Sequence, residues 1–162
     1  MKKYAFLFGV LFVFVLSCSK FNPKTYLQNV SNYVNKASML FVHLDSALVD
    51  TTLSIDQLKQ EYDNVGKQLQ ANYKEFENLK KEGDDILYPV VKQYFDTLMY
   101  VYNNQMKEIL SIREQNPNLK DINVSMKVAD LKINYGLSLP DLATKLGTAI
   151  DKFREKYKIN KN

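Results

Sequence analysis

The stretch from residue 55 to residue 79 restricts the fold of this chain more than any other part. Its inward-facing set recurs in steps of three and four positions without a slip, as Ile55, Leu58, Tyr62, Val65, Leu69, Asn72, Phe76 and Leu79. This spacing places side chains on one face of an α-helix. The stretch is therefore predicted to be a helix packed on other helices. We expect its one polar member, Asn72, at the edge of the packed face; burial that fixes the register is the alternative.

A similar pattern precedes this stretch, and its members are Tyr26, Val30, Tyr33, Ala37, Leu40 and Leu44. It predicts a helix that runs to about Val49. Asp50-Thr51-Thr52 breaks the pattern, and Ser54 is placed to cap the next helix. Lys80, Lys81 and Gly83 suit the end of that second helix.

A third helix is expected from Asp84 or Asp85 to about Gln115, with Pro89 tolerated in its first turn. More than half of its circumference is apolar, so it should be the central helix, with neighbours on two sides. Asn116-Pro117-Asn118 ends it. Its apolar set is Val90, Val91, Tyr94, Phe95, Leu98, Met99, Val101, Tyr102, Met106, Ile109 and Leu110.

Residues 119–137 fit two patterns, because their apolar residues alternate like a strand and also recur at helical spacing. We expect a short helix that Gly136 ends, since an isolated hairpin is marginal in water; a hairpin is the alternative. Ser138 and Asp141 resemble a capping pair for a last helix. The buried face of that helix would consist of Leu142, Leu146, Ile150, Phe153 and Tyr157.

The pattern as a whole predicts an all-α fold, an up-down bundle of four to five helices that follows a cleaved signal peptide. We expect the bundle domain to cover residues 25–158 and the tail, residues 159–162, to fray. Residues 1–17 would be the signal peptide, and residues 18–24 a short tether.

The signal peptide is indicated by Lys2 and Lys3, which precede an apolar run from Tyr4 to Leu16 that Gly9 interrupts. The run ends in Val15-Leu16-Ser17-Cys18, and Cys18 is the sole cysteine. In these residues the chain resembles a bacterial lipoprotein precursor. That resemblance implies a diacylglycerol on the Cys18 sulfur, cleavage before Cys18 and acylation of the new amino terminus.

Two other interpretations of the leader remain open. Cleavage without lipid would leave Cys18 as a lone thiol. An uncleaved anchor would need about 20 apolar residues to span a bilayer, more than this run offers. The body loosely resembles small all-helical surface lipoproteins of unknown function, which implies the outer membrane or cell surface rather than the inner membrane.

Charge argues against nucleic acid as a partner. Without Lys2 and Lys3, the 22 Lys and Arg residues fall to 20, against 18 Asp and Glu. A surplus of two cations without a basic stripe gives little attraction to phosphate. With one cysteine there is no internal disulfide, so packing must provide the stability.

The sequence offers little chemistry. His43 is the sole histidine, and no acidic residue lies three or four positions from it on its own face. We find no Gly-rich phosphate loop and no paired Glu-x-x-His of a bundle metal site. We therefore expect neither an enzyme nor a bound metal or cofactor.

Two functions remain as hypotheses. The first is a lipid-anchored interaction module whose outer face binds an envelope protein. The second is a small-ligand binder with a pocket between bundle helices, lined by Tyr94, Tyr102 and Met106. Tyrosines with an apolar body and a polar tip suit binding surfaces as well as bundle boundaries.

Replacement of Cys18 tests the leader directly. If Cys18 carries the lipid, Cys18→Ala abolishes acylation and cleavage before residue 18, because the peptidase needs the modified cysteine. Mass spectrometry of the native protein should show acyl chains on an N-terminal Cys18, and the variant should leave the detergent phase. An intact Met1 or an unmodified Cys18 thiol in the parent would refute the interpretation.

Overall fold

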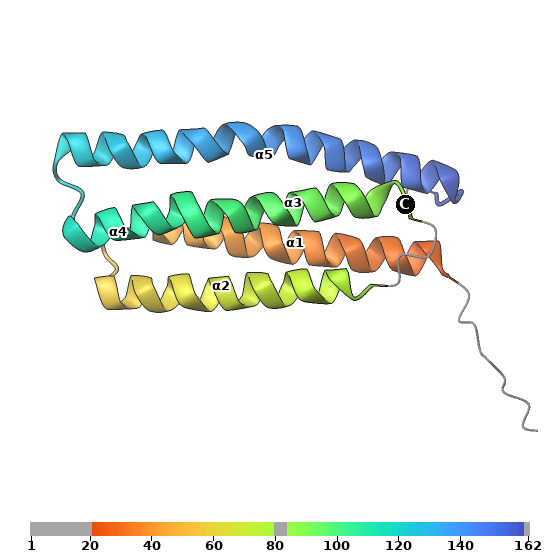
Figure 1. The fold of residues 1–162 in the computed structure, drawn as a ribbon, viewed down its shortest axis with the longest axis horizontal. Coiled ribbons are helices and arrows are strands. Elements are labelled where there is room, and N and C mark those ends of the chain that lie inside the picture. The colour runs from red at the N-terminus through yellow and green to blue at the C-terminus, as the bar shows by residue number, and fades with distance from the viewer. Residues whose placement is uncertain (1–20, 80–83, 161–162) are drawn as a thin grey trace, which may run out of the picture.

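The computed structural model describes residues 21–79 and 84–160, and within them every regular element is helical. The elements are α1 (Pro23–Ala47), α2 (Ile55–Glu77), α3 (Leu87–Val101), the π-helical segment η1 (Tyr102–Met106), α4 (Lys107–Gln115) and α5 (Ile122–Lys156). Because α3, η1 and α4 follow without a break, the bundle consists of four rods that run alternately up and down (Figure 1). The predicted up-down bundle is confirmed.

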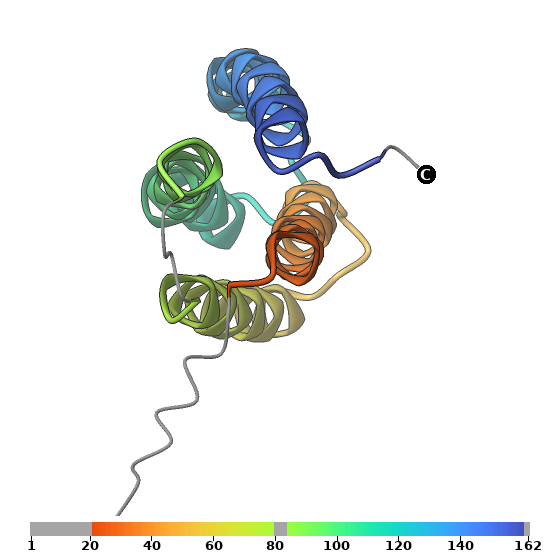
Figure 2. The ribbon, with the colours of Figure 1, turned by 90° about the vertical axis from the view of Figure 1, so that its right-hand side faces the viewer.

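The third rod has neighbours on two sides, as its wide apolar surface predicts, but α1 also lies between α2 and α5, so the third rod is not more central than α1 (Figure 2). Helix α3 contacts α1, α2 and α5, whereas α2 and α5 lie on opposite sides of the bundle (Figure 2). The start of α1, the end of α2, the start of α3 and the end of α5 share one end of the bundle, here called the N-terminal end (Figure 1). The α1–α2 turn and the α4–α5 turn lie at the far end.

The starts of α2 and α3 follow the expected capping chemistry. The Ser54 hydroxyl accepts from the Gln57 backbone N–H at 3.2 Å, and the Gln57 side chain accepts from the Ser54 N–H at 3.0 Å. Before α3, the Asp84 carboxylate accepts from the N–H groups of residues 86, 87 and 88. Helix α1 ends at Ala47, two residues before the predicted Val49. Lys80, Lys81 and Gly83 lie outside the described residues.

Arg113 fastens the turn between α1 and α2, a role that its sequence position does not reveal. Its side chain is fully buried. The guanidinium donates to the carbonyl oxygens of Leu48 at 2.9 Å and Asp50 at 3.0 Å. A cation at the last carbonyls of a helix compensates their partial negative charge. Arg113 thereby ties α4 to the end of α1.

Asn72 is fully buried, so the expectation that it lies at the edge of the α2 seam is wrong. Its side-chain amide donates to the Tyr33 carbonyl oxygen of α1 at 2.7 Å. The contact fits the alternative stated for Asn72, a buried polar residue that fixes the register of α2 against α1. The neighbouring seam residues Leu69 and Phe76 are buried as predicted.

Residues 119–137 do not form a separate short helix, and Gly136 does not end one. Helix α5 runs through Gly136, Ser138 and Pro140, so the capping pair of Ser138 and Asp141 is also wrong. The Ser138 hydroxyl donates to the Tyr135 carbonyl oxygen inside the helix. The buried residues Val128, Tyr135, Leu142 and Ala149 recur every seven positions across this region, so one seam packs on the core throughout. Tertiary packing outweighs the two local helix breakers.

The tail is ordered at its start. Lys158 has a left-handed φ of 53°, and the Ile159 N–H donates to the Arg154 carbonyl oxygen at 2.9 Å. This is the Schellman arrangement that closes many helices. Ile159 packs partly on the core, although we expected fraying from that residue. Residues 161 and 162 lie outside the description.

The π-helical segment η1 corrects the phase of the third rod. Leu98, Tyr102 and Met106 are all buried and follow one another in two steps of four. Because an α-helix turns every 3.6 residues, two successive steps of four drift away from the packed face. A wider π turn absorbs the extra residue and keeps the three side chains directed at the core.

Tyr62 and Tyr102 form a reciprocal contact between α2 and η1. Their rings stack with centroids 4.4 Å apart. The Tyr62 hydroxyl donates to the Tyr102 carbonyl oxygen at 2.7 Å, and the Tyr102 hydroxyl donates to the Tyr62 carbonyl oxygen at 3.2 Å. A Cβ atom at Gly66 would overlap the Tyr102 phenol, so the contact requires glycine at that position.

Replacement of Gly66 tests this contact. Gly66→Ala should lower the free energy of unfolding by roughly 1–3 kcal/mol, because the Tyr102 ring must move out of its stack and hydrogen bond. Gly147→Ala is the matched control. A Cβ at Gly147 meets nothing within 4 Å, so alanine there should stabilise α5 by about 0.5–1 kcal/mol. Urea unfolding of residues 19–162 measures both, and a Gly66→Ala variant as stable as its parent would contradict the packing described.

Candidate functional site

Cys18 lies outside the described residues, but the point where the chain reaches the bundle is fixed. Phe21, three residues after Cys18, packs its ring on Tyr26 of α1 and Tyr157 after α5, with centroids 5.3 and 5.7 Å apart. Both tyrosines also contact Phe153 of α5. This aromatic cluster holds the start of the described chain against the N-terminal end of the bundle.

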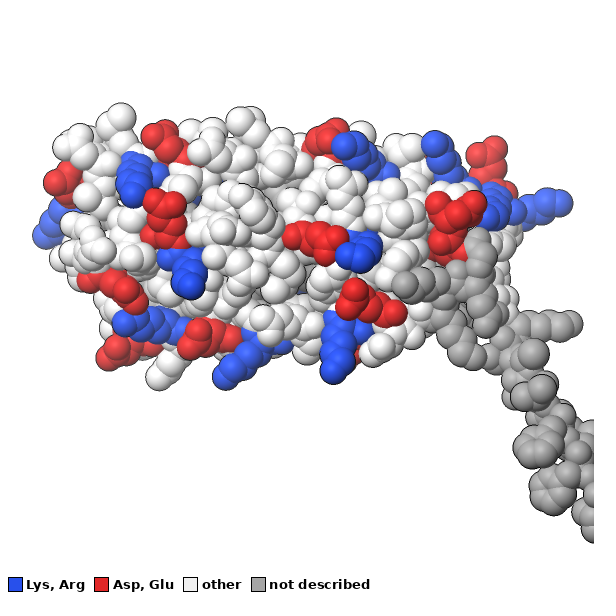
Figure 3. Space-filling model, in the orientation of Figure 1, with Lys and Arg blue, Asp and Glu red and all other residues white. Residues whose placement is uncertain are grey.

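Charges around this end are mixed and partly paired. Lys156 donates to the carboxylate of Asp85 at 2.6 Å, and Arg154 lies 3.6 Å from Asp151. The hydrogen bond from Lys156 holds the pKa of the Asp85 carboxyl below its usual range. On the face in Figure 3, Lys and Arg alternate with Asp and Glu and form no continuous band of one sign. The bundle therefore presents no strong single-sign field on that face.

The predicted ligand residues Tyr94, Tyr102 and Met106 lie in the core, with exposed fractions of 8%, 6% and 0%. The Tyr94 hydroxyl is 2.7 Å from the Ser38 hydroxyl of α1, and Tyr102 is held by Tyr62. Their polar groups thus have partners within the bundle. Ligand binding at these three residues stays a prediction, and it would require the core to open.

His43 is exposed and pairs with α2. Its Nε2 atom lies 2.6 Å from Glu61 Oε1. The sequence could not show this partner, because Glu61 is on a different helix. Within residues 21–79 and 84–160, no group of three or more His, Cys, Asp or Glu side chains is arranged to hold a metal ion. His43 contributes a contact between α1 and α2.

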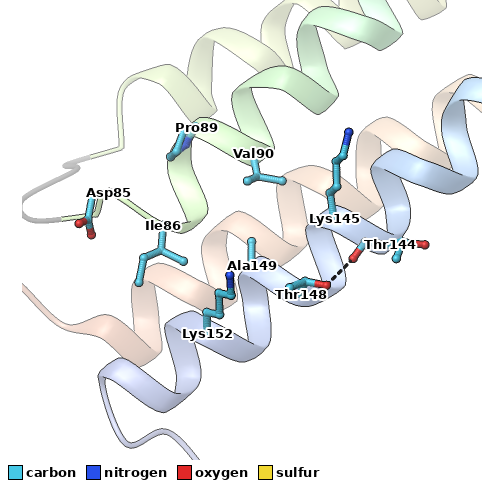
Figure 4. Close-up of a pocket in the computed structure, with 9 residues that line it drawn as sticks. All are labelled: Asp85, Ile86, Pro89, Val90, Thr144, Lys145, Thr148, Ala149 and Lys152. Atoms are coloured by element: carbon cyan, nitrogen blue, oxygen red, sulfur yellow. Dashed lines mark hydrogen bonds between the residues drawn. The ribbon is translucent and has the colours of Figure 1, made fainter.

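A groove between α3 and α5 combines apolar and charged lining residues. Its volume is about 470 Å³, within the range of small-molecule sites. Ile86, Pro89 and Val90 line one side, and Ala149 faces them from α5 (Figure 4). The remaining lining residues are polar or charged: Asp85, Thr144, Lys145, Thr148 and Lys152.

The groove results from small side chains on α5 beside the start of α3. Thr144, Thr148 and Ala149 are too short to fill the space against Pro89 and Val90. The Thr148 hydroxyl donates to the Thr144 carbonyl oxygen at 3.0 Å, so it is turned back onto its own helix. The sequence did not predict this groove. The pattern of each helix shows that both belong to one bundle, but it does not show how α3 and α5 are offset along their axes.

Comparisons with family models, with curated proteins and with solved structures find no match to this chain. Among the described helices, none is both long and apolar enough to cross a membrane.

The buried tyrosines predict a stability that falls in alkali. Burial raises the pKa of both Tyr94 and Tyr102 above the usual tyrosine value. A raised pKa in the folded state means that the stabilisation is complete below about pH 10 and is lost as pH rises beyond it. Urea unfolding between pH 9 and pH 11 should show this decline. Tyr94→Phe should make the decline shallower, by up to about 1.4 kcal/mol per pH unit; an unchanged slope would contradict the assignment.

Proposed function

We propose that this protein is a lipid-anchored interaction module of the bacterial cell envelope, in the outer membrane or at the cell surface. It is anchored at Cys18 and binds an envelope protein through the outer surface of α5. The N-terminal leader supports the anchor. An unpartnered apolar stripe on α5 supports the interaction and is the observation that carries the proposal.

The short tether places the bundle close to the membrane. From Cys18 to Phe21 there are three residue steps, which span at most about 11 Å when extended. Since Phe21 packs on Tyr157, the residues after Phe21 do not add to the length of the tether. An acylated Cys18 would therefore hold the N-terminal end of the bundle next to the lipid headgroups, with the far end directed away.

The α5 outer stripe consists of Ile122, Met126, Ile133 and Leu137, which are 69%, 58%, 57% and 73% exposed. Ile133 and Leu137 each lie two residues from the buried Tyr135, about 200° around the helix, and so face away from the core. Contiguous apolar side chains on a surface mark sites where another protein binds.

The stripe has the spacing of a helix–helix seam. With Ala129 and Pro140, it follows steps of four and three from Ile122 onward, and Gly136 lies next to Leu137. None of these positions is charged. A Cβ at Gly136 meets nothing within 4 Å. An exposed glycine destabilises a helix but lets a second helix approach closely. These features fit a helical segment of the partner.

The position of the stripe suits a tethered protein. It occupies the half of α5 that starts at the far end of the bundle. From Leu137 to Lys156 the helix rises about 28 Å, so the stripe lies well clear of the anchored end. A partner that stands on the same membrane or faces it could reach this surface.

Site-specific photocrosslinking in the native envelope tests the proposal. A photoreactive residue at Leu137 should give a reproducible crosslink to one protein. The same residue at Lys67, on the exposed face of α2, should not. Ile133→Glu should weaken the Leu137 crosslink by about tenfold or more, because the interface would bury an unpaired carboxylate.

Lys67→Glu is the matched charge change and should leave the crosslink unaltered. Since Ile133 and Lys67 are both exposed, neither substitution should disturb the fold, which circular dichroism verifies. Equal crosslinking at Leu137 and Lys67, or a crosslink insensitive to Ile133→Glu, would refute the α5 interface.

A further inference from the structure

We propose that the α3–α5 groove is a binding site for a single-chain fatty carboxylate. The alkyl chain would lie over Ile86, Val90 and Ala149, and the carboxylate would pair with Lys152. This site differs from the ligand residues that the sequence suggested. It depends neither on Cys18 nor on the α5 outer stripe, so its failure would leave the tethered module intact.

The apolar side of the groove fits an alkyl chain. Ile86 and Val90 are half-buried, and Ala149, which faces them from α5, is buried. Ile86, Pro89 and Val90 supply the apolar side from the start of α3, and the groove extends along α5 for about two turns, roughly 10 Å from Lys145 to Lys152. Burial of alkyl carbons against such a surface contributes about 0.8 kcal/mol for each CH₂ removed from water. A chain of several carbons can therefore be retained.

The charged residues at the edge of the groove determine which head group can bind. Of the charged lining residues, Asp85 is paired with Lys156 and Lys145 with Asp141. For Lys152, no acidic partner exists among the described residues. Its side chain extends from α5 toward Ile86, at the edge of the apolar floor (Figure 4). A single ammonium group beside an apolar groove complements a monoanionic amphiphile.

A neutral amphiphile would use only the apolar part of the site, and an anion without an alkyl chain would use only Lys152. A fatty alcohol would bury its chain but leave Lys152 without a counter-ion. A short carboxylate would pair with Lys152 but leave the apolar floor in water. The arrangement of the apolar floor and Lys152 therefore favours a carboxylate with a chain of medium length.

Calorimetry on residues 19–162 tests the site with decanoate as the probe, below its micelle concentration. Decanol supplies the same chain without charge, and butyrate the same head with a short chain. We expect decanoate to bind about tenfold more tightly than decanol, and butyrate not to bind measurably. Equal affinity for decanol, or equal affinity for butyrate, would overturn the proposal.

Two variants locate the ligand. Lys152→Gln should weaken decanoate binding about five- to tenfold, whereas Lys67→Gln on α2 should not change it. Thr148→Phe, at an exposed position, should fill the groove and abolish binding. Chemical-shift changes in the unmodified bundle provide a check independent of any variant. They should centre on Ile86, Val90 and Ala149; changes centred elsewhere would overturn the assignment.

Discussion

The contact between Tyr62 and Tyr102 sets the register on which the rest of the bundle depends. Two hydrogen bonds, each from one hydroxyl to the other residue's carbonyl oxygen, and a stacked pair of rings fix α2 along the third rod. The contact needs the π turn of η1, which turns Tyr102 inward, and the bare backbone of Gly66. Because one cysteine excludes an internal disulfide, such packing constraints alone prevent the rods from sliding.

Polar contacts reinforce this register at other levels of the bundle. Asn72 joins α2 to the backbone of α1, and Arg113 joins α4 to the end of α1. The Lys132–Asp45 and His43–Glu61 pairs lie nearer the surface, where water reduces their contribution. The buried contacts therefore select one arrangement of helices, and the surface pairs add little free energy.

Helix α5 serves three roles on different faces. Its seam of Val128, Tyr135 and Leu142 packs on the core, and its outer stripe is left apolar and exposed. Its C-terminal half forms one wall of the groove beside α3. Its N-terminal half, at the far end, carries the stripe, and Tyr157, directly after its last turn, contacts Phe21. Helix α5 thus contributes to both surfaces that we propose as functional, the stripe in its N-terminal half and the groove in its C-terminal half.

The sequence by itself determined the helical class and most of the buried face of each helix, because spacing of three and four is a local property. It predicted one break too many, at Gly136, where α5 continues. It also provided the resemblance of residues 1–18 to a lipoprotein leader, a prediction that the described residues do not include. Tertiary structure decided the features that depend on contacts between helices. It carried α5 through Gly136 and Pro140, buried Asn72 and Arg113, and gave His43 its partner. It also buried Tyr94, Tyr102 and Met106 in the core and formed the α3–α5 groove, since the space between two helices depends on their register, which no single helix encodes.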